Sequence, residues 1–131
     1  MFIGEYTHTV DEKNRFSLPA KFRKELGSKV VVTRGKDHCL QLLPHKTWVA
    51  ISEEVSKLGH VDSDQRYARF TFSGASEIEI DSIGRILIPE FLREFAGLKN
   101  TLVVTGVHDR VEIWNDKRWT AYRKKLESEY A

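Results

Sequence analysis

The chain has 131 residues, 40% of them hydrophobic and 11% aromatic, which is enough apolar surface for one compact domain or for two halves that share a core. Its formal net charge of +2 is too small to indicate a polyanionic partner, and its single cysteine, Cys39, excludes an internal disulfide and a cysteine-rich zinc site. The N-terminus lacks the pattern of a signal peptide and no apolar run has membrane-spanning length, so we expect a soluble intracellular protein.

The predicted elements of the first half follow one another closely. A strand leads into turn-forming residues at 11–14, a second strand follows, and Pro19 stands at the start of a short helix that ends at Gly27. Residues 30–32 are predicted as a buried strand, and residues 40–42 alternate apolar and polar side chains as a half-exposed strand does. The second half repeats this order of elements.

Each half is predicted to end in a longer helix. The first begins after Pro44 and is followed by a polar loop at 59–65, where Ser63 or Asp64 could cap a short helix through Phe70; the second has Asn115 as a candidate N-cap. Each helix carries one apolar stripe, made of Trp48, Ile51, Val55 and Leu58 in the first and of Trp119, Tyr122, Leu126 and Tyr130 in the second. We expect both tryptophans to pack onto the core; the alternative is an interface, with Tyr122, Leu126 and Tyr130 extending past the barrel towards a neighbouring subunit.

The region around the first turn is written twice. Residues 11–19 read Asp-Glu-Lys-Asn-Arg-Phe-Ser-Leu-Pro, and residues 81–89, seventy positions later, read Asp-Ser-Ile-Gly-Arg-Ile-Leu-Ile-Pro. The match extends in both directions through the pairs Phe2 and Phe72, Gly4 and Gly74, Arg23 and Arg93, and Gly27 and Gly97. Two copies are too few for a solenoid, so the duplication predicts one domain with internal pseudo-symmetry.

A fold class follows from this duplication. The few short strands of one copy cannot bury both faces of a sheet, and pairing the two copies would cover the exposed edges and create a shared core. We therefore predict an α+β, mainly β fold: a small intertwined β-barrel built from two pseudo-twofold repeats and flanked by short helices. We place the first repeat at 5–48, a helical connector at 49–73 and the second repeat at 74–119, with a C-terminal helix at 115–130.

The repeated motif has a known counterpart. The pattern Asp-x-x-Gly-Arg-x-x-Ile-Pro at residues 81–89 resembles the swapped-hairpin DNA-binding motif of AbrB-type bacterial transcription factors. Two copies in a chain of this length, each closed by a helix with a Trp, and the opening residues 1–6 resemble the MraZ family over nearly the whole chain. Both repeats would then be AbrB-like and the barrel would consist of swapped hairpins.

The resemblance implies a cytoplasmic, nucleoid-associated repressor of its own cell-division and cell-wall gene cluster. Such a regulator binds double-stranded DNA at tandem promoter repeats as a homo-oligomer in a closed ring, without a membrane, a small-molecule substrate or a cofactor. Two positions depart from the expected pattern, because Asn14 stands where the family usually has Gly and Ile83 stands where the first copy has Lys13. Since Asn tolerates left-handed backbone better than other non-Gly residues, we expect the first turn to survive.

Arg15 and Arg85 are the principal candidates for DNA contact. A guanidinium on a hairpin can bind guanine through two parallel hydrogen bonds, and the Asp four residues earlier can hold the Arg or accept from turn amides. The residues alone leave a second interpretation equally open, in which the Asp–Arg pair only closes the turn.

The first copy is the more basic of the two. Residues 11–25 hold five basic and three acidic side chains, whereas residues 81–95 hold two and three. The candidate DNA-binding set is Arg15, Lys13, Asn14, Arg85, Lys21, Arg23 and Lys24, and the candidate turn-organising set is Asp11, Asp81, Gly84, Pro19 and Pro89. Each helix cation taken singly also fits an ordinary solvated surface.

The sequence offers no catalytic or metal-binding constellation. The five histidines form no pair at helical metal spacing, Glu53 and Glu54 point to different sides of their helix, and no glycine-rich phosphate loop is present. We therefore expect no enzyme and no metal site. The alternative to a DNA-binding regulator is a protein-interaction or assembly module of antitoxin-like type with incidental affinity for DNA.

Overall fold

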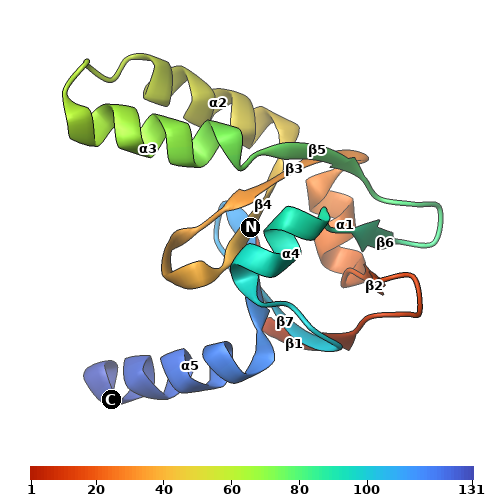
Figure 1. The fold of residues 1–131 in the computed structure, drawn as a ribbon. Coiled ribbons are helices and arrows are strands. Elements are labelled where there is room, and N and C mark those ends of the chain that lie inside the picture. Colours follow the sequence, from red (N-terminus) through yellow and green to blue (C-terminus); the bar gives the residue numbers. More distant parts are fainter.

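The computed structural model describes residues 1–131 (Figure 1). The strands are β1 (Glu5–Thr9), β2 (Arg15–Ser17), β3 (Lys29–Arg34), β4 (Leu40–Pro44), β5 (Ser76–Glu79), β6 (Arg85–Leu87), β7 (Thr101–Val107) and β8 (Arg110–Asn115). The helices are α1 (Ala20–Leu26), α2 (His45–Ser56), α3 (Asp62–Ser73), α4 (Glu90–Ala96) and α5 (Asp116–Tyr130), with one 3₁₀ turn at Lys36–His38. None of the helices is long and apolar enough to cross a lipid bilayer.

The two halves of the chain exchange strands. β1 from the first half pairs with β7 of the second, β5 from the second half pairs with β3 of the first, and β2 pairs with β6. All of these pairs are antiparallel, and the main sheet has the order β1-β7-β8-β4-β3-β5. The exchange confirms the predicted α+β, mainly β class and its swapped hairpins.

The sheet is open, so the expected closure into a barrel is not formed by hydrogen bonds. β1 and β5 stand at its two ends, and β2 and β6 form a separate two-stranded ribbon. The turns at 11–14 and 81–84 lead the chain away from the preceding strands, β1 and β5. The three-residue strands that follow, β2 and β6, therefore pair with each other and not with the main sheet. Closure is achieved by packing, because the ribbon and two short helices cover the inner face of the sheet.

The core lies between this sheet and its cover, and both halves contribute to it. Its 17 buried residues include Phe16 and Ile86 from the ribbon, Phe22 from α1 and Leu92 from α4. The Phe22 ring meets the rings of Phe2 and Tyr6 edge to face, with centroids 5.5 Å and 5.4 Å away. The two repeats therefore fold as one cooperative unit around one core.

The remaining helices project from the opposite side of the molecule (Figure 1). In α2, Trp48 packs edge to face on Phe72 of α3, with ring centroids 5.7 Å apart. In α5, Trp119 and Tyr122 pack on Trp114 of β8 at 5.3 Å and 5.2 Å. Trp48 and Trp119 are thus half-buried, but they pack outside the 17-residue core, and Leu58 (39%) and Tyr130 (86%) at the far ends of their stripes are exposed. Asn115 caps α5 by accepting from the Arg118 N–H at 3.0 Å.

Candidate nucleic-acid interface

The candidate interface is the outer face of the β2–β6 ribbon. The antiparallel register places Arg15 opposite Leu87 and Ser17 opposite Arg85, and directly paired residues share a face. These four side chains point outward, because Phe16 and Ile86 fill the inner face and are buried. The loops at 11–14 and 81–84 project from the same end of the molecule, away from α2, α3 and α5 (Figure 1).

One aspartate organises the turn of each hairpin. The Asp11 Oδ1 atom accepts from the backbone N–H groups of Lys13 and Arg15, both at 2.9 Å, and Asp81 does the same for Ile83 and Arg85 at 3.1 Å and 2.8 Å. Each turn also closes through a backbone hydrogen bond of 3.0 Å: the Asn14 N–H donates to the Asp11 carbonyl, and the Gly84 N–H donates to the Asp81 carbonyl. The assignment of both aspartates as turn organisers is consistent with this geometry.

Pro19 and Pro89 stand directly before α1 and α4, as N-caps. Their φ values of −53° and −54° suit a helix start, and each proline carbonyl accepts from residues three and four positions later. Each short helix thus begins at a fixed distance from its ribbon strand. This arrangement places Lys21 of α1 beside Tyr6 of β1.

The two arginines are held by their aspartates but keep free donors. The Nε atom of Arg15 donates to Asp11 Oδ2 at 3.0 Å, and that of Arg85 donates to Asp81 Oδ2 at 2.8 Å. Nη1 of Arg85 also lies 3.7 Å from Asp11 Oδ2, so one carboxylate faces both guanidinium groups. Nη1 and Nη2 of Arg15 form no hydrogen bond or ion pair, and its side chain is 29% exposed. Turn closure and DNA contact are therefore compatible, since they use different nitrogens.

Hydrogen bonding lowers the pKa of both aspartates. The backbone N–H of Arg15 is the largest cause for Asp11, and that of Arg85 is the largest cause for Asp81, with the paired guanidinium groups adding to each. A carboxyl group with a pKa below its ordinary value of 3.8 stabilises the fold above that value. This stabilisation is lost as the pH falls through the lowered folded-state pKa.

An acid-stability measurement checks this account of the turns. We expect Asp11→Asn with Asp81→Asn to flatten the decline in melting temperature between about pH 4 and pH 2, because neither amide titrates. Asp62→Asn is the matched control, since Asp62 is an exposed carboxylate that pairs only with Arg66 at 3.8 Å. Melting curves of the double variant that parallel those of the wild type throughout the acid range would contradict the assignment.

The first turn tolerates its asparagine as predicted. Asn14 has a φ of 61° and Gly84 a φ of 87°, so both residues adopt left-handed backbone. Of the other predicted cations, Lys13 and Lys24 are exposed, and Lys21 Nζ lies 5.0 Å from the centre of the Tyr6 ring. Arg23 differs, because it is half-buried and turns toward the second hairpin loop rather than toward the first.

Comparison with known proteins gives the family. The family model described as "MraZ protein, putative antitoxin-like" matches the chain twice, over residues 1–70 and 71–130. The chain belongs to the MraZ family. Two relatives named "Transcriptional regulator MraZ" come from Moorella thermoacetica, at 47% identity, and Syntrophomonas wolfei subsp. wolfei, at 44%; each alignment covers 99% of this chain and 92% of the relative. The MraZ family is thus one of transcriptional regulators and not of enzymes.

The match to solved structures is weaker. The solution structure of PHS018 from Pyrococcus horikoshii aligns with 86% of this chain and 88% of its own, at 13% identity and a TM-score of 0.35. A TM-score this low does not establish a common fold with the MraZ chain. Its family assignment rests on the sequence relatives and on the doubled match of the family model.

The outer faces of the two MraZ hairpins differ in chemistry at two positions besides the Lys13 and Ile83 pair that the sequence had already indicated. Three positions on the first hairpin and its helix are polar or basic, and their partners seventy residues later are exposed and apolar. The pairs are Lys13 and Ile83 (61% exposed), Ser17 and Leu87 (50%), and Lys21 and Phe91 (45%). Comparing the type of side chain, and not only the charge, at each position of residues 13–21 and 83–91 would have found the pairs Ser17 and Leu87 and Lys21 and Phe91.

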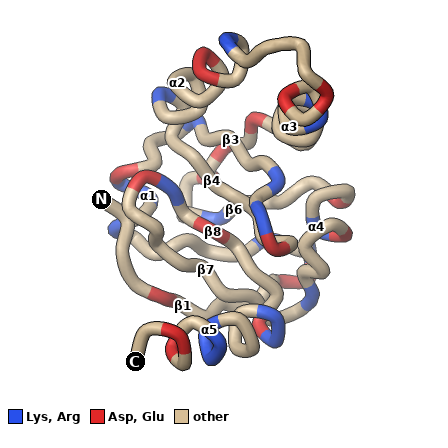
Figure 2. The backbone as a smooth tube through the Cα atoms, turned by 90° about the vertical axis from the view of Figure 1, so that its left-hand side faces the viewer, with Lys and Arg blue, Asp and Glu red and all other residues tan.

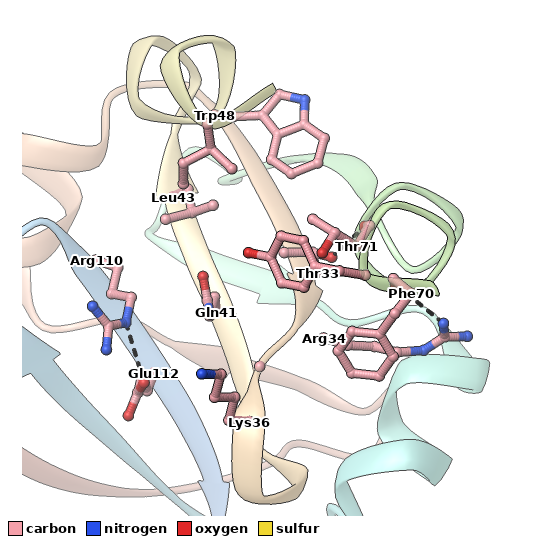
Figure 3. Close-up of a pocket in the computed structure, with 13 residues that line it drawn as sticks. Thr33, Arg34, Lys36, Gln41, Leu43, Trp48, Phe70, Thr71, Arg110 and Glu112 are labelled. Carbon is pink, nitrogen blue, oxygen red and sulfur yellow. Dashed lines mark hydrogen bonds and ion pairs between the residues drawn. The ribbon is translucent and has the colours of Figure 1, made fainter. Parts of the chain in front are cut away.

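A separate cavity of about 260 Å³ lies on the opposite side of the sheet (Figure 3). Two pairs of its polar groups bind each other: the Thr33 hydroxyl donates to the Thr71 carbonyl at 2.8 Å, and Arg110 Nε pairs with Glu112 at 3.2 Å. The Arg34 side chain runs past Phe70, and its Nη1 donates to the Phe70 carbonyl at 3.3 Å (Figure 3). No group of three or more His, Cys, Asp or Glu residues is placed to hold a metal.

The side that carries α2, α3 and α5 has mixed charge. Figure 2 shows basic and acidic residues interspersed along α2 and α3, whereas in α5 the acidic residues lie at the two ends and the basic residues between them. The mixed charges of α2 and α3 therefore offer a polyanion no continuous basic track, whereas α5 holds five basic residues between positions 117 and 125 with no acidic residue among them. The ribbon end combines two outward arginines, Arg15 and Arg85, with the exposed Lys13.

Proposed function

We propose that this MraZ protein is a sequence-specific DNA-binding repressor that contacts tandem promoter repeats through the outer face of its β2–β6 ribbon. The observation that carries the proposal is the geometry of Arg15, whose Nε is fixed by Asp11 while its two Nη groups have no protein partner. A guanidinium oriented in this way can donate to the O6 and N7 atoms of guanine in the major groove. Arg85 occupies the pseudo-symmetric place on the same face.

Phosphate contacts are assigned to the first hairpin and its helix. Lys13, Asn14, Lys21 and Lys24 are exposed there, whereas the matching surface of the second hairpin carries Ile83, Leu87 and Phe91. Cationic side chains beside a base-reading arginine fix the register of the protein on the duplex without reading sequence. The first hairpin therefore supplies more of the binding energy than the second.

The proposed regulator acts as a ring-shaped homo-oligomer. The net charge of +2 makes a single subunit a weak ligand for DNA, and an oligomer repeats the basic hairpin at regular intervals. Binding to repeats upstream of its own cell-division and cell-wall gene cluster would then repress that cluster. This function places the protein on the nucleoid, in the cytoplasm.

A protein-interaction module is the second candidate function. The exposed apolar set on the second hairpin, defined by Ile83, Leu87 and Phe91, favours it, because exposed apolar side chains are common where proteins associate. The description of the family as antitoxin-like points in the same direction. In that case DNA affinity would be incidental and weakly specific.

A salt titration separates the two functions. For the DNA-binding regulator, affinity for DNA from its own upstream region should fall steeply between 50 and 200 mM salt while remaining about 10³-fold or more above that for random DNA. Fluorescence anisotropy with matched specific and scrambled duplexes measures both quantities. Equal affinity for the two duplexes at every salt concentration would reject the regulator and favour the interaction module.

A further inference from the structure

Arg23 links the first half of the chain to the hairpin loop of the second half. It lies on α1, and its Nη1 donates to the Ile83 carbonyl, sixty residues away, at 3.3 Å. Its Nε is buried and has no hydrogen-bond partner. A residue that approached DNA phosphates would extend its guanidinium into solvent, and Arg23 instead lies along the loop at 81–84.

The Arg23 side chain occupies the space beside Gly84 that a larger side chain would fill. A Cβ atom at position 84 would lie 1.9 Å from Arg23 Nη1 and 2.5 Å from its Cδ and Cζ atoms. Any larger side chain at this position would therefore displace the arginine. The carbonyl of Gly84 also accepts from the Leu18 N–H at 3.0 Å, so the loop is attached to the first half on two sides.

The first hairpin provides an internal control, because it has the same turn but the counterpart of Arg23 bonds elsewhere. Asn14 adopts the same left-handed backbone and donates the same turn hydrogen bond as Gly84, so the turn itself does not require glycine. Arg93, the counterpart of Arg23, donates from its Nε to the Ile88 carbonyl at 3.0 Å and not to the loop at 11–14. The Leu18 N–H donates to the Gly84 carbonyl, but the equivalent hydrogen bond in the other half, from the Ile88 N–H to the Asn14 carbonyl, is not formed.

We propose that Arg23 is a positioning residue that fixes the loop at 81–84, that Gly84 is kept small to receive it, and that the loop at 11–14 has no such attachment. The consequence for DNA rests on the proposed function. The loop at 81–84 holds Arg85 in one place, and the loop at 11–14, which carries Lys13 and Asn14 and meets the second half through the longer 3.7 Å pair of Asp11 with Arg85, adapts to the backbone of the duplex. Arg23 then influences DNA binding through the second hairpin and makes no phosphate contact.

The first test is hydrogen exchange of the full-length protein without DNA. Arg23→Ala and Gly84→Asn should each speed exchange of the Gly84 and Arg85 amides by about fivefold to tenfold, the size expected for the loss of one hydrogen bond with its packing. The double variant should be no faster than either single variant, because both remove the same contact. Arg93→Ala and Asn14→Gly are the matched controls and should leave these amides unchanged.

The second test distinguishes positioning from phosphate contact. Gly84→Asn retains every charge, so if Arg23 acts only through the loop, Gly84→Asn and Arg23→Ala should weaken binding to upstream DNA equally and leave the salt dependence unchanged. Lys24→Ala, which removes an exposed cation from the same helix, should lower the slope of log K against log salt by about one per bound subunit. A lowered slope in Arg23→Ala with unchanged loop exchange would overturn the proposal. The exchange result stands even if the wild-type protein fails to bind DNA.

Discussion

Arg15→Ala should abolish specific DNA binding while the protein remains folded. Each lost guanine contact weakens binding by about 1–3 kcal/mol, and an oligomer on tandem repeats loses one contact per bound subunit, so even two subunits lose a factor of about 30 to 10⁴. The fold loses little, because the Arg15 side chain is partly exposed and its pair with Asp11 is one of several contacts in the turn.

Gel shift on upstream fragments measures this loss, with circular dichroism and melting temperature as folding controls. Arg15→Lys keeps the charge but lacks the planar fork, so it should keep binding to random DNA and lose most of the specificity. Arg85→Ala is the pseudo-symmetric comparison and should cost less, because its neighbours Ile83 and Leu87 supply no phosphate contact. Unchanged affinity of folded Arg15→Ala would remove the central residue of the proposal.

Affinity should rise steeply with the number of promoter repeats. Linking binding sites in one oligomer converts the second contact into an intramolecular one, which raises affinity by about 10²–10⁴ without any new interaction. We therefore expect duplexes with one repeat to bind near the level of random DNA, and duplexes with two or three repeats to bind progressively more tightly. Anisotropy titrations across this series measure the gain.

The spacing of the repeats supplies the control. Inserting five base pairs between two repeats turns the second by about half a helical turn onto the opposite face of the duplex, where a rigid oligomer cannot reach it. The gain from the second repeat should then disappear, and it should return when the insertion is ten base pairs. Equal affinity for one, two and three repeats at any spacing would show that a single subunit binds alone.

Much of the fold was predictable because the duplicated segments are local patterns. The Asp, Arg and Pro spacing of residues 11–19 and 81–89 identified both turns, the ribbon strands and the starts of α1 and α4, all of which depend on neighbours in sequence. The left-handed φ of Asn14 was expected for the same reason. Duplication also indicated that the halves share one core, since neither could bury its apolar residues alone.

The features that were not predicted depend on contacts between the halves. The sheet stays open because β2 and β6 pair with each other. This pairing joins residues from the two halves of the chain, so the sequence of one copy alone does not indicate it. Arg23 was grouped with Lys21 and Lys24 because all three are cations of α1, but its direction is set by space left beside Gly84, sixty-one positions later. Sequence spacing gives the side of a helix, and it gives no information on which distant loop packs there.

The central claim is that the ribbon face of an oligomer reads regularly spaced guanine-containing repeats upstream of its own gene. Footprinting of the purified full-length protein on that DNA tests it most directly. We predict protected segments at regular intervals, which disappear together in Arg15→Ala and persist in Asp62→Asn, a substitution on the opposite side of the molecule. Protection that is absent, or uniform along the fragment and unaffected by Arg15→Ala, would contradict the account.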